Sequence, residues 1–102
     1  MLVKIHKACR YVVAVCDSDL IGKRFEDIKE GKDVQIDLTG GFFKGDEKTK
    51  QETREIIRDM RNEDACFNFA GKESVKLGKE KGLINDSGII EISGVPIALC
   101  LL

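Results

Sequence analysis

Two carboxylates follow an apolar run and are the first residues in the chain that suggest chemistry. The run Val12–Val15 is followed by Asp17 and Asp19. Paired carboxylates bind cations or move protons. A calcium loop of the EF-hand type needs alternating oxygen ligands and a distant Glu, and Gly22 comes too early for that pattern. We favour a structural role, in which Asp17 or Ser18 caps the turn that follows.

The single histidine, His6, lies close in sequence to Cys9 and Cys16. A Cys–His pair can form a nucleophile, and Cys9 has basic neighbours that would favour a reactive thiolate. Structural zinc sites gather four ligands from short paired spacings, which this region lacks. A small enzyme or metal-binding protein that uses His6, Cys9, Cys16, Asp17 and Asp19 is therefore an alternative, and we favour a protein with neither enzymatic activity, metal nor cofactor.

The four cysteines, at positions 9, 16, 66 and 100, contain no C-x-x-C pair. Most of them stand in apolar runs. In a chain without a secretion signal, this usage predicts reduced and mostly buried thiols rather than a disulfide framework.

The first half of the chain predicts strands. Leu2–His6 and Tyr11–Cys16 are separated by a short polar connector, which favours a hairpin. Lys23–Lys32 is charged, and the helical spacing of its large apolar residues indicates at most a short helix or turn. Asp33–Leu38 alternates strictly between polar and apolar residues, as a half-buried strand does.

The second half predicts two helices and a strand pair. A helix begins near Thr49, because Thr49 and Glu52 fit a capping box. Gly71–Lys81 reads as a second helix. Ile89–Ser93 and Pro96–Leu102 are typical of a final strand pair, the second of them covered on both faces.

Length and composition support one domain over residues 1–102, with 42% hydrophobic and 34% charged residues. The order of elements predicts an α+β fold. We expect a mixed or antiparallel sheet with an N-terminal hairpin, a C-terminal strand pair and two main helices packed on one face.

The second predicted helix has a stripe of small residues, Gly71, Ser74 and Gly78. A glycine inside a helix costs about 1 kcal/mol relative to alanine. We therefore expect this stripe to pack closely against the sheet or another backbone.

A basic stripe runs along the same helix, with Lys72, Lys76 and Lys79 at helical spacing. Asn68 stands shortly before Gly71, where the first helical amides can accept an anion. Contact with phosphate or an RNA backbone is the functional interpretation. A solvated face of mixed charge is the structural interpretation, and the interspersed acids favour it.

Phe42 and Phe43 stand between two turns and next to Lys44. RNA-binding sheets present aromatic side chains beside basic residues, so that bases can stack. The alternative is that at least one of the two rings belongs to the core, because the chain has only 5 Phe and no Trp.

The 17 basic and 18 acidic residues give a net charge of -1. No overall field attracts nucleic acid or a membrane, so such binding would need a local patch. The longest apolar run, Val95–Leu102, is much shorter than the ~20 residues of a membrane span. Because no signal segment is visible, we expect a cytoplasmic protein without a membrane partner.

Several short motifs follow one another from one end of the chain to the other. None is specific alone, and their order carries the information. They are Val3–His6, Val13–Asp17, Leu20, Gly22–Lys23, Phe43–Gly45, Asn68, Gly71, Ser74–Val75, Gly82–Ile84 and Gly94–Pro96. In this order they resemble an archaeal family of proteins of unknown function, DUF424. That family often has a histidine after the proline, where this chain has Ile97, so a site built on that imidazole would be absent or altered here.

The resemblance implies an archaeal cytoplasmic protein and brings no activity, cofactor or catalytic residue. Genes of the family are often grouped with translation machinery, which is an association and not a mechanism. We expect a small non-enzymatic binding module with RNA, the ribosome or translation factors as partners. Its candidate surface comprises Asn68, Gly71, Lys72, Lys76, Lys79, Phe43 and Lys44. A subunit or homodimer that associates through the apolar end, Leu99–Leu102, is a further alternative.

Overall fold

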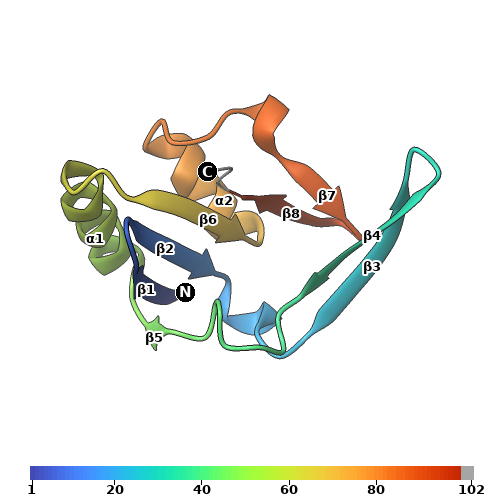
Figure 1. Cartoon of the computed structure of the whole chain (residues 1–102), viewed down its shortest axis with the longest axis horizontal. Helices are drawn as coiled ribbons and strands as arrows, with labels where there is room; N and C mark the ends of the chain where they lie inside the picture. Colours follow the sequence, from blue (N-terminus) through green and yellow to red (C-terminus); the bar gives the residue numbers. More distant parts are fainter. Residues whose placement is uncertain (100–102) are drawn as a thin grey trace.

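The computed structural model describes residues 1–99, which form a six-stranded sheet with a two-stranded arm (Figure 1). The spatial order of the sheet is β5 (Asp46–Glu47), β1 (Leu2–Lys7), β2 (Tyr11–Cys16), β6 (Cys66–Ala70), β8 (Val95–Ala98) and β7 (Ile90–Ile92). Strands β2 and β6 are parallel, and the other pairs are antiparallel. The predicted mixed sheet, with its N-terminal hairpin and C-terminal strand pair, is confirmed.

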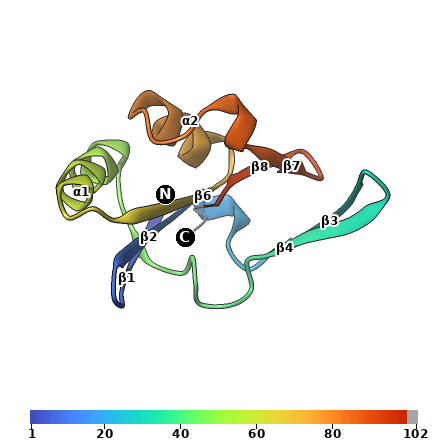
Figure 2. The same ribbon diagram turned by 45° about the horizontal axis from the view of Figure 1, so that its top comes forward.

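Both main helices lie on one face of this sheet, as predicted (Figure 2). They are α1 (Lys50–Asn62) and α2 (Lys72–Glu80). Ile57 of α1 and Val75 of α2 pack with Phe69 of β6 in the first buried cluster. Short 3-10 turns lie at Ser18–Leu20 and Asp86–Gly88.

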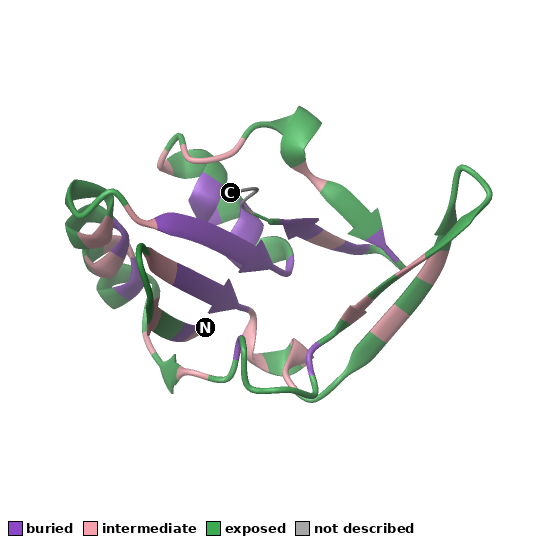
Figure 3. Cartoon of the chain, in the orientation of Figure 1, coloured by how far each residue is buried: buried purple, intermediate pink, exposed green. Residues whose placement is uncertain are grey.

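The opposite face is covered in part by the arm and by the segment that follows it. The arm consists of β3 (Arg24–Lys29) and β4 (Lys32–Asp37). Leu38 and Phe43 then pack with Ala14 in a second buried cluster. Figure 3 shows the result: β2 and β6 are buried along most of their length, whereas the arm alternates between exposed and half-buried residues.

The arm corrects the prediction of a short helix or turn for Lys23–Lys32. Glu30 and Gly31 both have positive φ, 51° and 76°, as the two central residues of a type I′ hairpin turn do. Phe25 then faces Ile36 across the ladder, whereas Ile28 lies on the other side of the ribbon and is 67% exposed. The helical spacing was misleading because strand pairing decides the conformation here.

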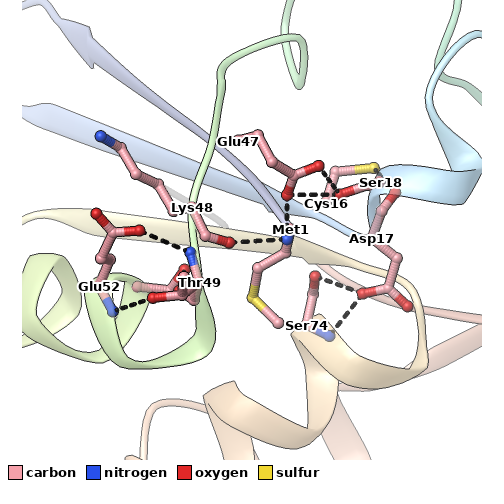
Figure 4. Close-up of polar contacts among 10 residues, drawn as sticks. Met1, Cys16, Asp17, Ser18, Glu47, Lys48, Thr49, Glu52 and Ser74 are labelled. Carbon is pink, nitrogen blue, oxygen red and sulfur yellow. Dashed lines mark hydrogen bonds and ion pairs between the residues drawn. The ribbon is translucent and has the colours of Figure 1, made fainter.

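The ends of other elements match their sequence signals. The Thr49 hydroxyl accepts a hydrogen bond from the Glu52 amide at 3.0 Å, and the Glu52 carboxylate accepts one from the Thr49 amide at 2.9 Å, so the capping box is confirmed (Figure 4).

Strand β8 ends at Ala98, and Leu99 is 50% exposed, which differs from the expected strand covered on both faces. The remainder of that prediction, residues 100–102, lies outside the described residues.

The stripe of small residues on α2 packs closely against the sheet, as expected. A Cβ atom at Gly78 would lie 2.9 Å from Cε2 of Phe69, whose side chain is fully buried, and 3.0 Å from Cδ1 of Ile84. The missing side chain therefore lets α2 approach β6, and this contact offsets the cost of glycine in the helix.

We expect Gly78→Ala to lower the free energy of unfolding by about 1 kcal/mol. Overpacking against Phe69 costs about 1–3 kcal/mol and exceeds the gain in helix propensity of about 1 kcal/mol. Urea denaturation measures the change. Gly41→Ala is the matched control, because its Cβ would enter open space. A Gly78→Ala protein as stable as the parent would contradict close packing.

Candidate functional site

The carboxyl ends of the parallel strands β2 and β6 meet at one edge of the sheet. Asp17 follows β2, and Gly71 follows β6 before α2 begins. In sheets with parallel strands this edge is the usual place for ligands. It also joins two features that the sequence separates, the Asp17/Asp19 pair and the start of the second helix.

Asp17 caps α2 rather than the turn that follows it. Its carboxylate accepts hydrogen bonds from the backbone amides of Ser74 at 2.8 Å and Glu73 at 3.1 Å, and from the Ser74 hydroxyl at 2.7 Å (Figure 4). The 3-10 turn after Asp17 has no side-chain cap. The capping interpretation is therefore correct in kind, but the partner is the helix more than fifty residues away.

Gly71 is required by this arrangement. Its φ is 107°, and a Cβ atom there would lie 2.3 Å from Cγ of Asp17. The Gly71 amide donates to the carbonyl of Pro96 at 2.9 Å, and the Asp17 amide donates to that of Ala70, also at 2.9 Å. An anion bound at the start of α2 would have to displace the protein's own carboxylate, so the geometry argues against the predicted phosphate contact there.

Asn68 does not lie at the helix start. It is a residue of β6, paired in register with Ala14, and only 7% exposed. The alternation of the strand places it on the same face as Ala14, which belongs to the cluster opposite the helices. Reading Asn68 as an anion contact beside the first turn of α2 is therefore wrong.

Asp17 and Asp19 do share a cavity with the start of α2. The cavity has a volume of about 270 Å³ and is lined by Asp17, Asp19, Leu20, Lys72, Gly94, Val95 and Pro96. Its charged groups are the capping carboxylate, one further carboxylate and one ammonium. Asp17 is engaged by the helix amides, so the two carboxylates do not form a free pair for proton transfer or cation binding.

The alternative thiol and acid site is not assembled. His6 pairs with Val12 at one end of the β1–β2 ladder, and Cys16 pairs with Leu2 at the other. Cys9 is exposed in the connecting turn. Within residues 1–99, no three His, Cys, Asp or Glu side chains are grouped to hold a metal ion.

Cys16 is an inert thiol by its surroundings. Burial, and secondarily the charges of Asp17 and Asp19, raise its pKa to about 12. Its Sγ donates to the Asp17 carbonyl at 3.3 Å. Cys9 and Cys16 are free thiols, as the cysteine usage predicts for them.

The predicted basic stripe on α2 is exposed but not purely basic. Lys72, Lys76 and Lys79 are all exposed. Lys79 forms an ion pair with Asp86 at 2.6 Å, and Glu73 between the lysines pairs with Lys50 of α1 at 2.9 Å. This pattern fits a solvated face of mixed charge better than a phosphate track.

A second candidate surface lies on the face opposite the helices, at the β1 side. Phe42 is 45% exposed, and its ring stacks on the His6 imidazole with centroids 4.6 Å apart and planes 14° apart. The His6 Nε2 donates to the Phe42 carbonyl at 2.8 Å, which fixes the loop to the strand. Lys4 shares a face of β1 with His6, and Lys44 follows two residues after Phe42. We name Lys4, His6, Phe42 and Lys44 the aromatic surface.

Phe43 does not belong to this surface. It is 4% exposed and packs in the second buried cluster, so it belongs to the core, and its neighbour Phe42 is the exposed ring. The sequence makes both rings candidates for base stacking, and Phe43 is the one assigned to the candidate surface, whereas Phe42 is the exposed one. Sequence reasoning missed Lys4, although the alternation that places Lys4 and His6 on one strand face was the available signal.

The structure thus defines a small α+β protein with a mixed sheet and two main helices on one of its faces. It is similar to the crystal structure of an uncharacterised conserved protein from Methanopyrus kandleri, with a TM-score of 0.75 and 23% sequence identity. The alignment covers 99% of this chain and 93% of the other, so the likeness extends over the whole fold.

A family model for proteins of unknown function, DUF424, matches residues 6–101. The chain belongs to this family. No curated protein matches the sequence. Within residues 1–99, the helices are too short or too polar to cross a membrane.

We expect Asp17→Asn to lower the free energy of unfolding by about 1–2 kcal/mol. The amide keeps one acceptor but turns its NH2 group toward a helix amide, so one capping bond is lost. Thermal and urea denaturation measure the change. Asp19→Asn, in the same cavity, is the control and should stay within about 0.5 kcal/mol of the parent. Equal losses for both variants would argue against the cap.

We expect iodoacetamide at pH 8 to label Cys9 and to spare Cys16 in the folded protein. The thiolate is the reactive form, and a pKa of about 12 leaves almost none of it at Cys16. Intact mass measurement compares Cys9→Ser with Cys9→Ser/Cys16→Ser: the two variants should take up equal numbers of labels when folded and differ by one label after unfolding. An extra label on folded Cys9→Ser relative to the double variant would show that Cys16 is accessible and ionised.

Proposed function

We propose that this protein is a non-enzymatic module that binds single-stranded RNA through the aromatic surface. The observation that carries the proposal is Phe42, an exposed ring that stacks on His6. Lys4 shares a face of β1 with His6, and Lys44 lies two residues after Phe42. Proteins that bind single strands combine stacking platforms with basic residues that follow the backbone. This aromatic surface has both components.

The order of the site supports base stacking. A free phenylalanine in a loop would lose conformational freedom on binding, which weakens association. Here the His6–Phe42 stack and the hydrogen bond from His6 fix the ring beforehand. Phe43 anchors the same loop in the core, with its ring edge-on to Phe42 at 5.1 Å between centroids.

The local charge supports phosphate contact despite the net charge of -1. Lys4, Lys44 and Lys48 line one cavity, in which Asp46 is the sole acidic group among the described residues. By contrast, Lys76 and Lys79 on α2 stand among acids. The basic patch that nucleic-acid binding requires is therefore better supplied next to β1 than on α2.

A role in translation would follow from the same chemistry, since ribosomal RNA presents single-stranded loops and unstacked bases. The gene association that comes with the family resemblance favours this setting. Affinity capture from an archaeal lysate, with and without nuclease, would separate ribosomal from protein partners.

We expect a fluorescent oligouridine of about ten nucleotides to bind with an affinity that falls as salt rises. Phe42→Ala should weaken binding about 5- to 150-fold, which corresponds to the loss of ~1–3 kcal/mol of base stacking, and should leave the salt slope unchanged. Lys44→Ala should reduce the slope by about 0.7, the value for one phosphate contact on a single strand. Fluorescence anisotropy at several salt concentrations measures the affinity and its salt slope.

Ile90→Ala and Lys32→Ala are the matched controls, because both residues are exposed and lie on other parts of the fold. Lys76→Ala tests the alternative on α2. A loss there and none at Lys44 would move the site to the helix. No binding at low salt, or an affinity that ignores salt, would reject an RNA-backbone contact altogether.

A further inference from the structure

Strand β1 is only partly covered on its outer side. Its neighbour β5 pairs with Leu2 and Val3 and then ends. The Val3 carbonyl faces this side, because a Cβ atom at Gly45 would lie 2.0 Å from its oxygen. Alternate residues of an antiparallel strand turn their backbone groups to the same side. The amides and carbonyls of Ile5 and Lys7 therefore also face outward.

Within the described part of the chain, these outward groups have no strand beside them. Among residues 1–99, no backbone hydrogen bond connects Ile5 or Lys7 to the segment after β4. That segment instead closes on itself: the Lys44 amide donates to Gly41, and the Gly45 amide donates to Phe43. An open row of backbone donors and acceptors at a sheet edge is a template for a further strand.

A groove runs along this open edge. Its volume is about 610 Å³, and its lining residues are Val3, Lys4, Ile5, Lys44, Gly45, Asp46, Lys48 and Ile56. The apolar part is formed by Val3 and Ile5 of β1 and Ile56 of α1, and Ile5 is 43% exposed. We name this set of residues the edge groove.

The charged residues that line the edge groove favour a negatively charged ligand. Lys4, Lys44 and Lys48 surround the apolar floor and are opposed by Asp46 alone within the described lining. Lysine on an edge strand discourages pairing with basic or apolar strands and favours an acidic one. The groove thus offers backbone bonds, an apolar contact and positive charge within one extended site.

We propose that the edge groove binds an extended acidic segment of a partner protein, which adds to the sheet as a strand beside β1. Ile5 and Lys7 supply the backbone hydrogen bonds. Alternate apolar side chains of the segment rest on Ile5 and Ile56, and its carboxylates meet the lysines. Main-chain bonds give affinity in this mode, and the side-chain contacts give specificity.

This site goes beyond the RNA-binding surface but adjoins it. Lys4 and Lys44 stand at the border of both, whereas Phe42 belongs to the aromatic surface and Ile5 to the edge groove. Occupation of the groove by carboxylates neutralises two lysines of the aromatic surface. An acidic segment and RNA therefore compete, and each ligand has a side chain that the other does not use.

The test uses three fluorescent peptides of about eight residues. The first alternates Glu and Val, the second replaces each Glu with Lys, and the third is the acidic peptide with alternate amides N-methylated. We expect the acidic peptide to bind, the basic one not to bind, and methylation to weaken binding at least about tenfold, since the methylated amides cannot donate to β1. Equal binding of the methylated peptide would overturn strand addition.

Ile5→Asn should reduce affinity for the acidic peptide about tenfold or more, because a neutral polar side chain replaces the apolar floor and adds no charge. Ile28→Asn is the matched control, an isoleucine exposed on the arm, and should bind like the parent. Should Ile5→Asn fail to fold by circular dichroism, Lys48→Glu repeats the test, with Lys32→Glu as its control. Equal affinities within each pair would overturn the proposal.

The two proposals fail separately. Phe42→Ala should abolish most RNA affinity and leave peptide affinity unchanged, and the neutral variant Ile5→Asn should do the reverse. A concentration-dependent mass of the protein alone that disappears in Ile5→Asn would assign the edge to a second copy of this chain and overturn the partner proposal.

Discussion

The Asp17 carboxylate connects the two halves of the molecule. It stands at the end of β2, in the N-terminal hairpin, and accepts three hydrogen bonds from the start of α2. The helix dipole adds to this attraction, because an anion is favoured at a helix N-terminus. Gly71 leaves the space for the carboxylate, and Gly78 lets the same helix lie close to Phe69. The Asp17 cap and the two glycines thus determine the position at which α2 packs on the sheet.

A cap of this kind removes the anion site that a helix N-terminus would otherwise offer. The same edge of the sheet in many α/β proteins uses these amides for a phosphate. Here the amides are satisfied within the chain, and Lys72 and Asp19 balance each other in the small cavity outside. The polar residues at this edge stabilise the fold, and the exposed aromatic and basic residues are collected at β1 instead.

Local signals in the sequence were reliable, and contacts between distant segments were not. Thr49 and Glu52 are three residues apart, so the capping box could be predicted from spacing alone. The strict alternation of Asp33–Leu38 likewise predicts a strand. Asp17 and Ser74 are 57 positions apart, and no periodicity in the sequence relates them.

Two adjacent residues of the same type present a different difficulty for prediction from sequence. Phe42 and Phe43 have the same chemistry and the same surroundings in the sequence. Which ring enters the core depends on the path of the loop, which His6 and the backbone bonds of Lys44 and Gly45 decide. The arm is a similar case, because a charged segment of weak propensity takes its conformation from the strand it pairs with.

The Gly22 amide donates to the Leu38 carbonyl at 2.7 Å and closes the base of the arm. Farther out, Ser93 joins the arm to the sheet: its amide donates to the Asp27 carboxylate at 3.0 Å, and its hydroxyl donates to the Glu26 carbonyl. The bond from the Ser93 amide helps to lower the pKa of Asp27, with the Ile28 amide as the second cause. A ribbon held this way can open as a unit while β2 and β6 stay protected. Amide hydrogen exchange will therefore report two separate cooperative regions in a chain of 102 residues.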